Sequence, residues 1–339
     1  MSTRALPIPT IPPPNMMAAV LPPQVHTLPH RLAANEGHVP ESQLGWLRPT
    51  TMDTPLSVMR HRLQTDKYLF LKGVIPREDV LAMRAHYFSQ YNTTDLLDPS
   101  QPASLGIFNP SASPSSHAGI GSGSNPAADA ELQILINAHT TPQYRDGPQS
   151  RVLGLGRDML RHNVPGGKST GVHYDKLFLR GGDAFFLTAW VPIGDIAYNG
   201  GGLIYLEDSA ELGEAIEEDF TRRAEAGQFS EEEKISAFNK NMSATGILSD
   251  NPTVFHAKHK EIAERIRRER KGYKWLTADY EAGDVVFHYP GTIHASGRNE
   301  DPKGRIRLST DLRFYSKEDY ERGATDERWG KFWVADDGL

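Results

Sequence analysis

The second half of the chain consists of short apolar runs separated by residues that favour turns. Four of these runs are rich in β-branched or aromatic residues and are bounded by Gly, Pro or Asn: residues 184–194, 201–207, 284–290 and 305–315. This composition is typical of strands. Several short strands joined by turns favour two sheets packed face to face. The sequence therefore predicts an all-β core of jelly-roll type.

Helices are expected to flank this core. A short apolar run at residues 68–71 is followed, from Arg77, by apolar residues at helical spacing. A second helical stretch is expected at about residues 129–139. The charged segment at about residues 209–275, between the second and third strand runs, is interpreted as a helical insert whose charged side chains face solvent.

The chain is expected to form one domain behind an N-terminal arm. Its first thirty residues contain eight prolines, so residues 1–44 are interpreted as a proline-rich arm and residues 45–339 as a single domain. Such an arm allows exchange between the subunits of a homodimer. Residues 109–132 are rich in Gly, Ser and Pro, which predicts either a lid that folds over a site or a disordered loop.

The composition limits the chemistry and the partners. The chain has 339 residues and no cysteine, so His, Asp and Glu are its strong metal ligands, and thiolate sites and disulfides are excluded. A net charge of -6 and a pI of about 6.1 argue against nucleic acid or an anionic membrane as partner. With neither a secretory signal nor a long apolar run, a cytoplasmic location is expected. Residues 31–39 only faintly resemble a peroxisomal address.

The stretch STGVHYDKLF places His173 and Asp175 two positions apart in a run that we expect to be extended. Alternate side chains of a strand share a face, so the imidazole and the carboxylate can converge on one point. They form either a buried hydrogen-bonded pair or part of a metal site. A second histidine, His294, follows a buried-looking strand far along the chain. Two imidazoles and one carboxylate are the set that holds non-haem Fe(II) and leaves three coordination positions open.

Residues near His294 refine this prediction. His288 lies inside the apolar run VVFHYP and is expected to pack or hydrogen-bond there. Arg307 and Ser309 share one face of a predicted strand, where a guanidinium and a hydroxyl can grip a carboxylate. A 2-oxo acid chelated at the metal, such as 2-oxoglutarate, has a distal carboxylate that needs this grip. Arg305 and Arg307 also suit edge-strand positions that oppose aggregation.

With these residues the sequence resembles the phytanoyl-CoA dioxygenase family of Fe(II)/2-oxoglutarate-dependent oxygenases, especially its members from filamentous fungi. The resemblance extends from about residue 45 to residue 315. It rests on an ordered set of motifs: H-x-D at His173, W-x-P-x-x-D from Trp190, N-G-G-x-L from Asn199, the distal His294 and R-x-S at Arg307. Taken alone, the N-G-G segment is equally an ordinary turn.

The resemblance implies a double-stranded β-helix, the cupin-like jelly roll, with flanking helices. It implies iron on His173, Asp175 and His294, with 2-oxoglutarate and O2 as cosubstrates. Arg307 corresponds best to the arginine that binds 2-oxoglutarate in the family. Trp190 corresponds to a tryptophan that lines the cosubstrate pocket, although it also suits an ordinary core position.

The sequence departs from the family pattern at three points. The family's arginine often lies eleven residues after the distal histidine, which here is Arg305; we prefer Arg307 because it completes the R-x-S motif. The PGSH that commonly follows the N-G segment is replaced by LEDS at residues 206–209. The insert also lengthens the interval between the two iron histidines. The last two departures affect the substrate side of the pocket.

The predicted function is that of a non-haem Fe(II)/2-oxoglutarate-dependent dioxygenase that hydroxylates, desaturates or cyclises a small organic substrate. Two alternatives remain at this point. One is a jelly-roll binding protein that carries a metal without catalysis, and the other is an iron oxygenase that does not use 2-oxoglutarate. Asp175 occupies the ligand position that a halogenase leaves open for chloride, which argues against halogenation.

Overall fold

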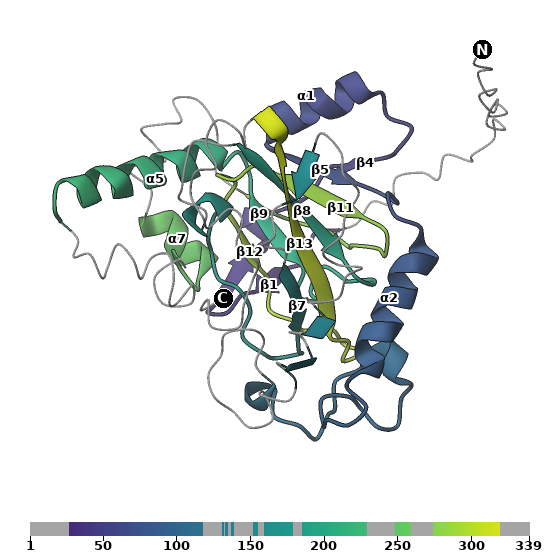
Figure 1. Cartoon of the computed structure of the whole chain (residues 1–339). Coiled ribbons are helices and arrows are strands. Elements are labelled where there is room, and N and C mark those ends of the chain that lie inside the picture. Colours follow the sequence, from purple (N-terminus) through teal and green to yellow (C-terminus); the bar gives the residue numbers. More distant parts are fainter. Residues whose placement is uncertain are drawn as a thin grey trace, which may run out of the picture.

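A computed structural model gives the fold of the chain. It describes residues 27–117, 131, 133–134, 137–138, 152–154, 159–178, 185–228, 248–258 and 274–318. Two β-sheets lie at its centre, and helices lie on both sides of them (Figure 1).

The larger sheet has seven strands. They are β4 (Pro49–Thr50), β5 (Tyr68–Leu71), β6 (Val152–Gly154), β7 (Met159–Asn163), β8 (Phe186–Pro192), β11 (Val285–His288) and β13 (Arg307–Ser316). Their order is β4-β5-β11-β8-β13-β6, and β7 also pairs with β13. All neighbours are antiparallel except β4 and β5.

The smaller sheet has the order β12-β9-β10-β3. Its strands are β3 (Leu44–Trp46), β9 (Leu203–Leu206), β10 (Trp275–Thr277) and β12 (His294–Ser296). The β3 and β10 strands are parallel, and the other pairs are antiparallel. A separate hairpin consists of β1 (Arg31–Ala33) and β2 (His38–Pro40).

The inner faces of the two sheets form a common apolar core. Phe70, Trp190 and Val286 of the larger sheet cluster with Tyr205 and Leu276 of the smaller one. Full burial of one such side chain stabilises the fold by about 2 kcal/mol. Because side chains alternate along a strand, the neighbouring residues of β9 and β10 face the opposite side. The structure therefore confirms the predicted jelly roll of two packed sheets.

The outer face of the smaller sheet is covered by a second apolar cluster. Ile204 and Trp275 contribute to it from the sheet, and the covering elements contribute Val39, Leu212 and Phe255. These elements are the β1–β2 hairpin, α5 (Ala210–Glu225) and α7 (Pro252–Lys258). Both helices fall inside the segment at about residues 209–275 for which a helical insert was predicted.

The outer face of the larger sheet is covered by α2 (Arg77–Ser89). Figure 1 shows α2 on the side of the sheets opposite α5 and α7, with α1 (Leu56–Asp66) at one edge. Val80, Tyr87 and Phe88 of this helix cluster with Leu160 and Ile193 of the sheet side. The remaining short elements are four 3-10 helices: η1 (Glu41–Gln43), η2 (Ala103–Leu105), η3 (Pro114–Ser116) and η4 (Asp175–Phe178).

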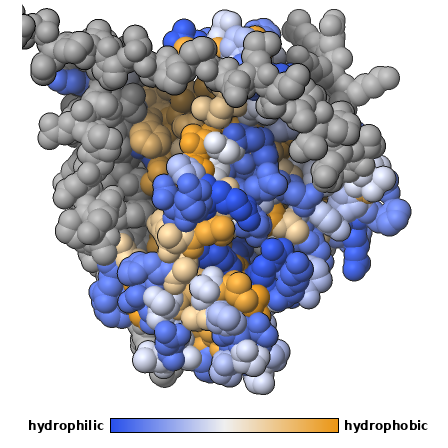
Figure 2. Space-filling model, turned by 90° about the vertical axis from the view of Figure 1, so that its right-hand side faces the viewer, coloured by the Kyte–Doolittle hydropathy of each residue, from blue (hydrophilic) through white to orange (hydrophobic). Residues whose placement is uncertain are grey.

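A groove of about 850 Å³ remains between α2 and the larger sheet. Met83 of α2, Val191 of β8 and Leu312 of β13 are among the residues that line it. Figure 2, which views the molecule from the side of α2, shows apolar residues exposed among hydrophilic ones on this face. The groove lies on the outer face of β13, so it is separated by that strand from the inner face of the sheet.

The four predicted strand runs correspond to β8, β9, β11 and β13, and the predicted helix from Arg77 is α2. The start of the folded region differs from the expected boundary at residue 45. Residues 31–40 already form the β1–β2 hairpin, because Leu32 and Val39 pack into the cluster beside the smaller sheet. Residues 1–26 lie outside the described part of the chain.

The Gly-, Ser- and Pro-rich segment is described only as far as His117. Residues 118–130 of the predicted lid or loop lie outside the described residues. The predicted helix at about residues 129–139 is helical at each of its described positions. Among the helices that the structure describes, none has both the length and the apolarity to cross a membrane.

A buried histidine beneath α2 makes stability depend on pH. His162 of β7 is 7% exposed and lies 2.8 Å from the hydroxyl oxygen of Tyr87, measured from Nδ1. Burial, together with the positive charge of Arg307, lowers the pKa of His162 to about 4. In the unfolded chain the pKa is about 6.5. Between these two values the unfolded state binds the proton first, so falling pH favours unfolding.

We therefore expect His162→Gln, which keeps a polar partner for Tyr87 but cannot titrate, to be less sensitive to acid than the wild type. The free energy of unfolding should fall between pH 7 and pH 5 by about 2 kcal/mol less in the variant. Urea titrations of both metal-free proteins at the two pH values measure the difference. An equal fall in both proteins would show that His162 is not held neutral in the fold.

Candidate metal centre

A reciprocal backbone bridge joins His173 to His294. The amide N–H of each residue donates to the carbonyl oxygen of the other, with a donor–acceptor distance of 2.9 Å in both cases. His294 begins β12, whereas His173 lies in an isolated bridge and Asp175 begins η4. The expectation that His173 and Asp175 share one strand is therefore wrong, because the extended backbone ends at the bridge and turns into a 3-10 helix.

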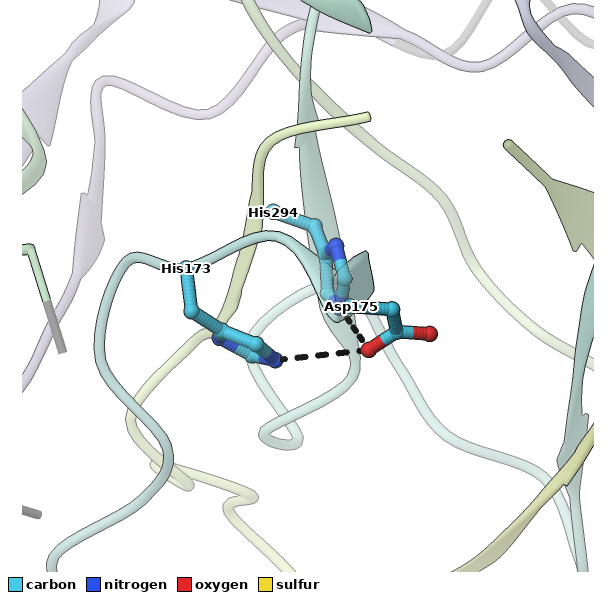
Figure 3. Close-up of side chains that lie close together, drawn as sticks. All are labelled: His173, Asp175 and His294. Carbon is cyan, nitrogen blue, oxygen red and sulfur yellow. Dashed lines mark ion pairs between the residues drawn. The ribbon is translucent and has the colours of Figure 1, made fainter. Parts of the chain in front are cut away.

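The bridge brings the two imidazole rings together, with centroids 4.2 Å apart. Nδ1 of His173 donates to the carbonyl oxygen of Gly171 at 2.8 Å, and Nδ1 of His294 donates to that of Thr292 at 2.9 Å. Since Nδ1 carries the hydrogen in both rings, the lone pair is at Nε2. Both Nε2 atoms point towards Asp175 (Figure 3).

The three side chains offer one ligand atom each, and these atoms lie within 4.8 Å of one another. Oδ1 of Asp175 is 4.0 Å from Nε2 of His173 and 3.8 Å from Nε2 of His294. These distances are too long for hydrogen bonds but suit ligands that surround one cation. The donor set therefore fits a divalent metal ion and disagrees with the alternative of a directly hydrogen-bonded His–Asp pair.

The ionisation states of the three residues also suit metal binding. Burial, with a smaller contribution from the neighbouring His288, lowers the pKa of His294 to about 4, and burial likewise lowers the pKa of His173. Burial alone would raise the pKa of Asp175, but the charge of Arg313 and the hydrogen bond from His288 outweigh it and hold the pKa well below its ordinary value. Neutral imidazoles and an ionised carboxylate are the forms that bind metals.

Contacts on the far side of Asp175 hold its carboxylate in place. Its Oδ2 accepts a hydrogen bond from Oγ1 of Thr188 on β8 and lies 3.2 Å from Nε2 of His288 on β11. A terminal nitrogen of Arg313 lies 3.6 Å from Oδ1. His288 is therefore a hydrogen-bonded core residue, as expected, and its partner is the carboxylate. Such outer contacts fix the direction in which a carboxylate ligand points.

Arg307 lies at the start of β13, in the same cavity as the three ligand residues. Nε donates to the carbonyl oxygen of Gly201 at 3.0 Å, and the two terminal nitrogens donate to Oγ of Ser309 at 2.8 Å and Oγ of Ser296 at 3.1 Å. Each terminal nitrogen carries two N–H groups, so one on each has no acceptor among the described residues. This pair of N–H groups matches the two oxygens of a carboxylate.

Arg307 and Arg305 have different surroundings in the structure. Arg305 is paired with Asp301, with a terminal nitrogen 2.7 Å from Oδ2, and its side chain is 27% exposed. Arg307 is 4% exposed, and burial lowers its pKa to about 10, with the charge of Arg161 contributing. The N-G-G segment is a turn, as its composition indicates, and Gly201 has a φ of 81° there. This turn presents the carbonyl oxygen that holds Arg307.

Six further residues of the cavity were not predicted from the sequence as site residues: Arg161, Thr170, Leu203, Ser296, Asp311 and Arg313. Nε of Arg161 donates to Asp311 at 3.2 Å. The sequence contained a signal for two of them. Alternate residues of a strand share a face, and Asp311 and Arg313 continue the alternation of Arg307 and Ser309 along β13. Trp190, which was predicted, lines the same cavity and is 1% exposed. Its ring also packs on Tyr280, with centroids 4.7 Å apart.

Several solved structures are similar to the chain at low identity. The carbocyclase SnoK from nogalamycin biosynthesis is 14% identical, with a TM-score of 0.41, and the match covers 80% of this chain and 87% of SnoK. EvdO2 from Micromonospora carbonacea var. aurantiaca is 13% identical, with a TM-score of 0.40 and coverages of 78% and 92%. HygX from Streptomyces hygroscopicus is 12% identical, with a TM-score of 0.35 and coverages of 78% and 88%. A search of curated proteins found no match.

The family comparison covers the part of the chain that contains His173, Asp175 and His294. The phytanoyl-CoA dioxygenase (PhyH) model matches residues 136–307, slightly more than half of the 339 residues. The matched segment contains the three ligand residues of the cavity and ends at Arg307. The chain therefore belongs to the phytanoyl-CoA dioxygenase family of iron- and 2-oxoglutarate-dependent oxygenases.

Proposed function

We propose that His173, Asp175 and His294 hold Fe(II), that Arg307 grips the distal carboxylate of 2-oxoglutarate, and that the enzyme hydroxylates a C–H bond of a small organic molecule. The observation that carries this proposal is that Arg307 lies in the same buried cavity as the three ligand residues. A cation site alone suits many proteins. A cation site next to a carboxylate-binding arginine suits a chelated oxo acid.

The bound iron supplies the oxidising chemistry, and the overall reaction converts a C–H group, 2-oxoglutarate and O2 into an alcohol, succinate and CO2. The chain supplies geometry. Three ligands on one side of the ion leave three adjacent positions for cosubstrates. Desaturation or ring closure would use the same site, with a different fate for the oxidised carbon.

Arg307 orients the cosubstrate by holding the carboxylate that is remote from the metal. Ser309, Ser296 and the Gly201 carbonyl fix three of its N–H groups, so the guanidinium is already oriented before a carboxylate arrives. Burial of this pair of charges excludes water and strengthens their attraction. Trp190 is proposed to form an apolar wall of the same pocket.

Binding requires side chains to move. The cavity has a volume of about 20 Å³, which is room for about one water molecule. Arg161 is one of the partly exposed residues of the lining, with 18% of its side chain accessible. We propose that Arg161 swings outwards when 2-oxoglutarate enters, which exchanges its contact with Asp311 for solvent.

The metal-containing binding protein remains the contrasting hypothesis, and anaerobic spectroscopy separates the two. Adding 2-oxoglutarate to the Fe(II)-loaded wild type should produce the weak visible charge-transfer band of an iron-chelated 2-oxo acid. His294→Ala removes one imidazole ligand and should give no band. A wild type that binds Fe(II) but shows no band would favour the binding protein.

The two neighbouring arginines provide a matched test of cosubstrate recognition. Arg307→Ala should weaken 2-oxoglutarate binding by about 10- to 100-fold, because it removes two charge-assisted hydrogen bonds. Arg305→Ala should change it by less than about threefold, since Arg305 pairs with Asp301 instead. Titration of the charge-transfer band measures both. The reverse ranking would assign the cosubstrate carboxylate to Arg305, and no effect of either substitution would show that the carboxylate is held elsewhere.

Substitution of Thr188 tests whether its hydrogen bond positions Asp175 for metal binding. Thr188→Val keeps the side-chain shape and removes the hydroxyl that donates to Asp175. We expect its affinity for Fe(II) to fall by about 10- to 100-fold, whereas Thr188→Ser should retain most of it. Fe(II) titrations in an anaerobic competition assay measure this effect. Equal affinity in Thr188→Val and the wild type would show that this hydrogen bond does not position the ligand.

A further inference from the structure

A second cluster of potential metal ligands lies outside the proposed iron site. Asp95, His117 and Glu131 each place one ligand atom within 4.8 Å of the other two. His117 is 1% exposed and Glu131 is 3% exposed. The side chain of Asp95 is 68% exposed. The cluster is thus buried on one side and open to solvent at Asp95.

Glu131 fixes the tautomer of His117. Nδ1 of His117 lies 2.8 Å from Oε1 of Glu131, so the ring N–H donates to the carboxylate. The lone pair of the neutral imidazole is then at Nε2. Histidines that bind a metal through one ring nitrogen typically donate from the other to a carboxylate or carbonyl. His117 and Glu131 are therefore arranged like a metal-binding histidine and the carboxylate that orients it.

The other ring nitrogen of His117 has no hydrogen-bond partner among the residues that the structure describes. Nε2 of His117 is buried and makes no hydrogen bond within the described residues, and the same holds for Oε2 of Glu131. Nε2 faces Oδ1 of Asp95 at 3.6 Å. This distance is too long for a hydrogen bond. It is the separation expected of two atoms that each bind one ion at about 2.1 Å.

The charges of the cluster also call for a cation. In the described part of the chain, the ion pairs of Asp95 and Glu131 are with His117 and not with a lysine or arginine. Two carboxyl groups around one imidazole, with no lysine or arginine among their described ion-pair partners, form a site that one divalent ion can neutralise.

We propose that Asp95, His117 and Glu131 form a second metal site, for a divalent first-row ion such as Zn²⁺. Oδ1 of Asp95 and Nε2 of His117 bind the ion, water completes its coordination, and Glu131 orients the imidazole and balances charge. One imidazole with carboxylate and water oxygens is a donor set that Zn²⁺ accepts.

The surroundings hold the two direct ligands in place without the ion. Phe108 packs edge-on against His117, with ring centroids 5.5 Å apart, and Asn109 donates to the carbonyl oxygen of Asp95 at 3.0 Å. The adjacent Ile107 forms a bridge with Arg305, close to the start of β13. An ion at this position therefore cross-links the segment around residue 95 to the one that ends at His117.

Equilibrium dialysis against Zn²⁺ tests the proposal. The background protein carries His173→Ala and Asp175→Ala, which remove the proposed iron site, and any affinity tag is cleaved off first. This background should bind one Zn²⁺ per chain. Adding Asp95→Asn, which changes an exposed side chain without changing its shape, should abolish tight binding. Adding Glu131→Gln, which keeps an acceptor for Nδ1, should weaken it by about 10- to 100-fold. Adding Asp98→Asn, at a partly exposed neighbouring position outside the cluster, should have no effect.

Two results would overturn the proposal. One is a background variant that binds no Zn²⁺, which would identify the cluster as a hydrogen-bonded structural motif. The other is Zn²⁺ binding that is unchanged by Asp95→Asn and Glu131→Gln, which would place the ion on other histidines. Neither result depends on 2-oxoglutarate or turnover, so both are independent of the proposed oxygenase function.

Discussion

The backbone bridge between His173 and His294 is the contact on which the rest of the site depends. Two hydrogen bonds of 2.9 Å hold the backbones of these residues side by side, so their imidazoles converge whatever the intervening chain does. The helical insert lies within that interval and leaves the convergence intact. The bridge joins the two ends of the long interval that contains the insert. The inserted segment can therefore vary in length without moving the two histidines.

The long strand β13 connects this centre to the remainder of the molecule. Arg307, Asp311 and Arg313 face the metal cavity, whereas Thr310 and Leu312 line the groove beneath α2. The charged face of β13 therefore lines the cavity, and its less polar face lies towards the helix α2. The charged face is tolerated in the interior because its guanidinium groups have nearby carboxylates, hydroxyls or carbonyls as partners.

The sequence predicted the strands β5, β8, β9, β11 and β13 and the helix α2, since apolar runs and helical spacing are local signals, but it did not predict α1 or the shorter strands of the two sheets. The cluster of His173, Asp175 and His294 and the place of Arg307 in the cavity agree with the order of the motifs, and Arg305 does not line the cavity. The sequence could not show that Asp175 begins a 3-10 helix, because the turn depends on the bridge from His173 to a distant strand. Residues 31–40 were misjudged for a similar reason: their composition resembles an arm, and only tertiary packing of Leu32 and Val39 makes them part of the core. The cluster of Asp95, His117 and Glu131 has no spacing pattern, since its members come together only in the folded chain.

Each ligand of the proposed iron site has its own anchor in the protein. His173 and His294 are fixed through Nδ1 by backbone carbonyls, and Asp175 is fixed by Thr188 and His288. In zinc fingers, by contrast, the ion itself holds the ligands together, and its loss unfolds the domain. Because the protein anchors each of the three side chains here, a chelator should leave a folded apoprotein that can be reloaded with a chosen metal. Replacement of the redox-active ion by an inert one then becomes a practical route to trapping substrate complexes.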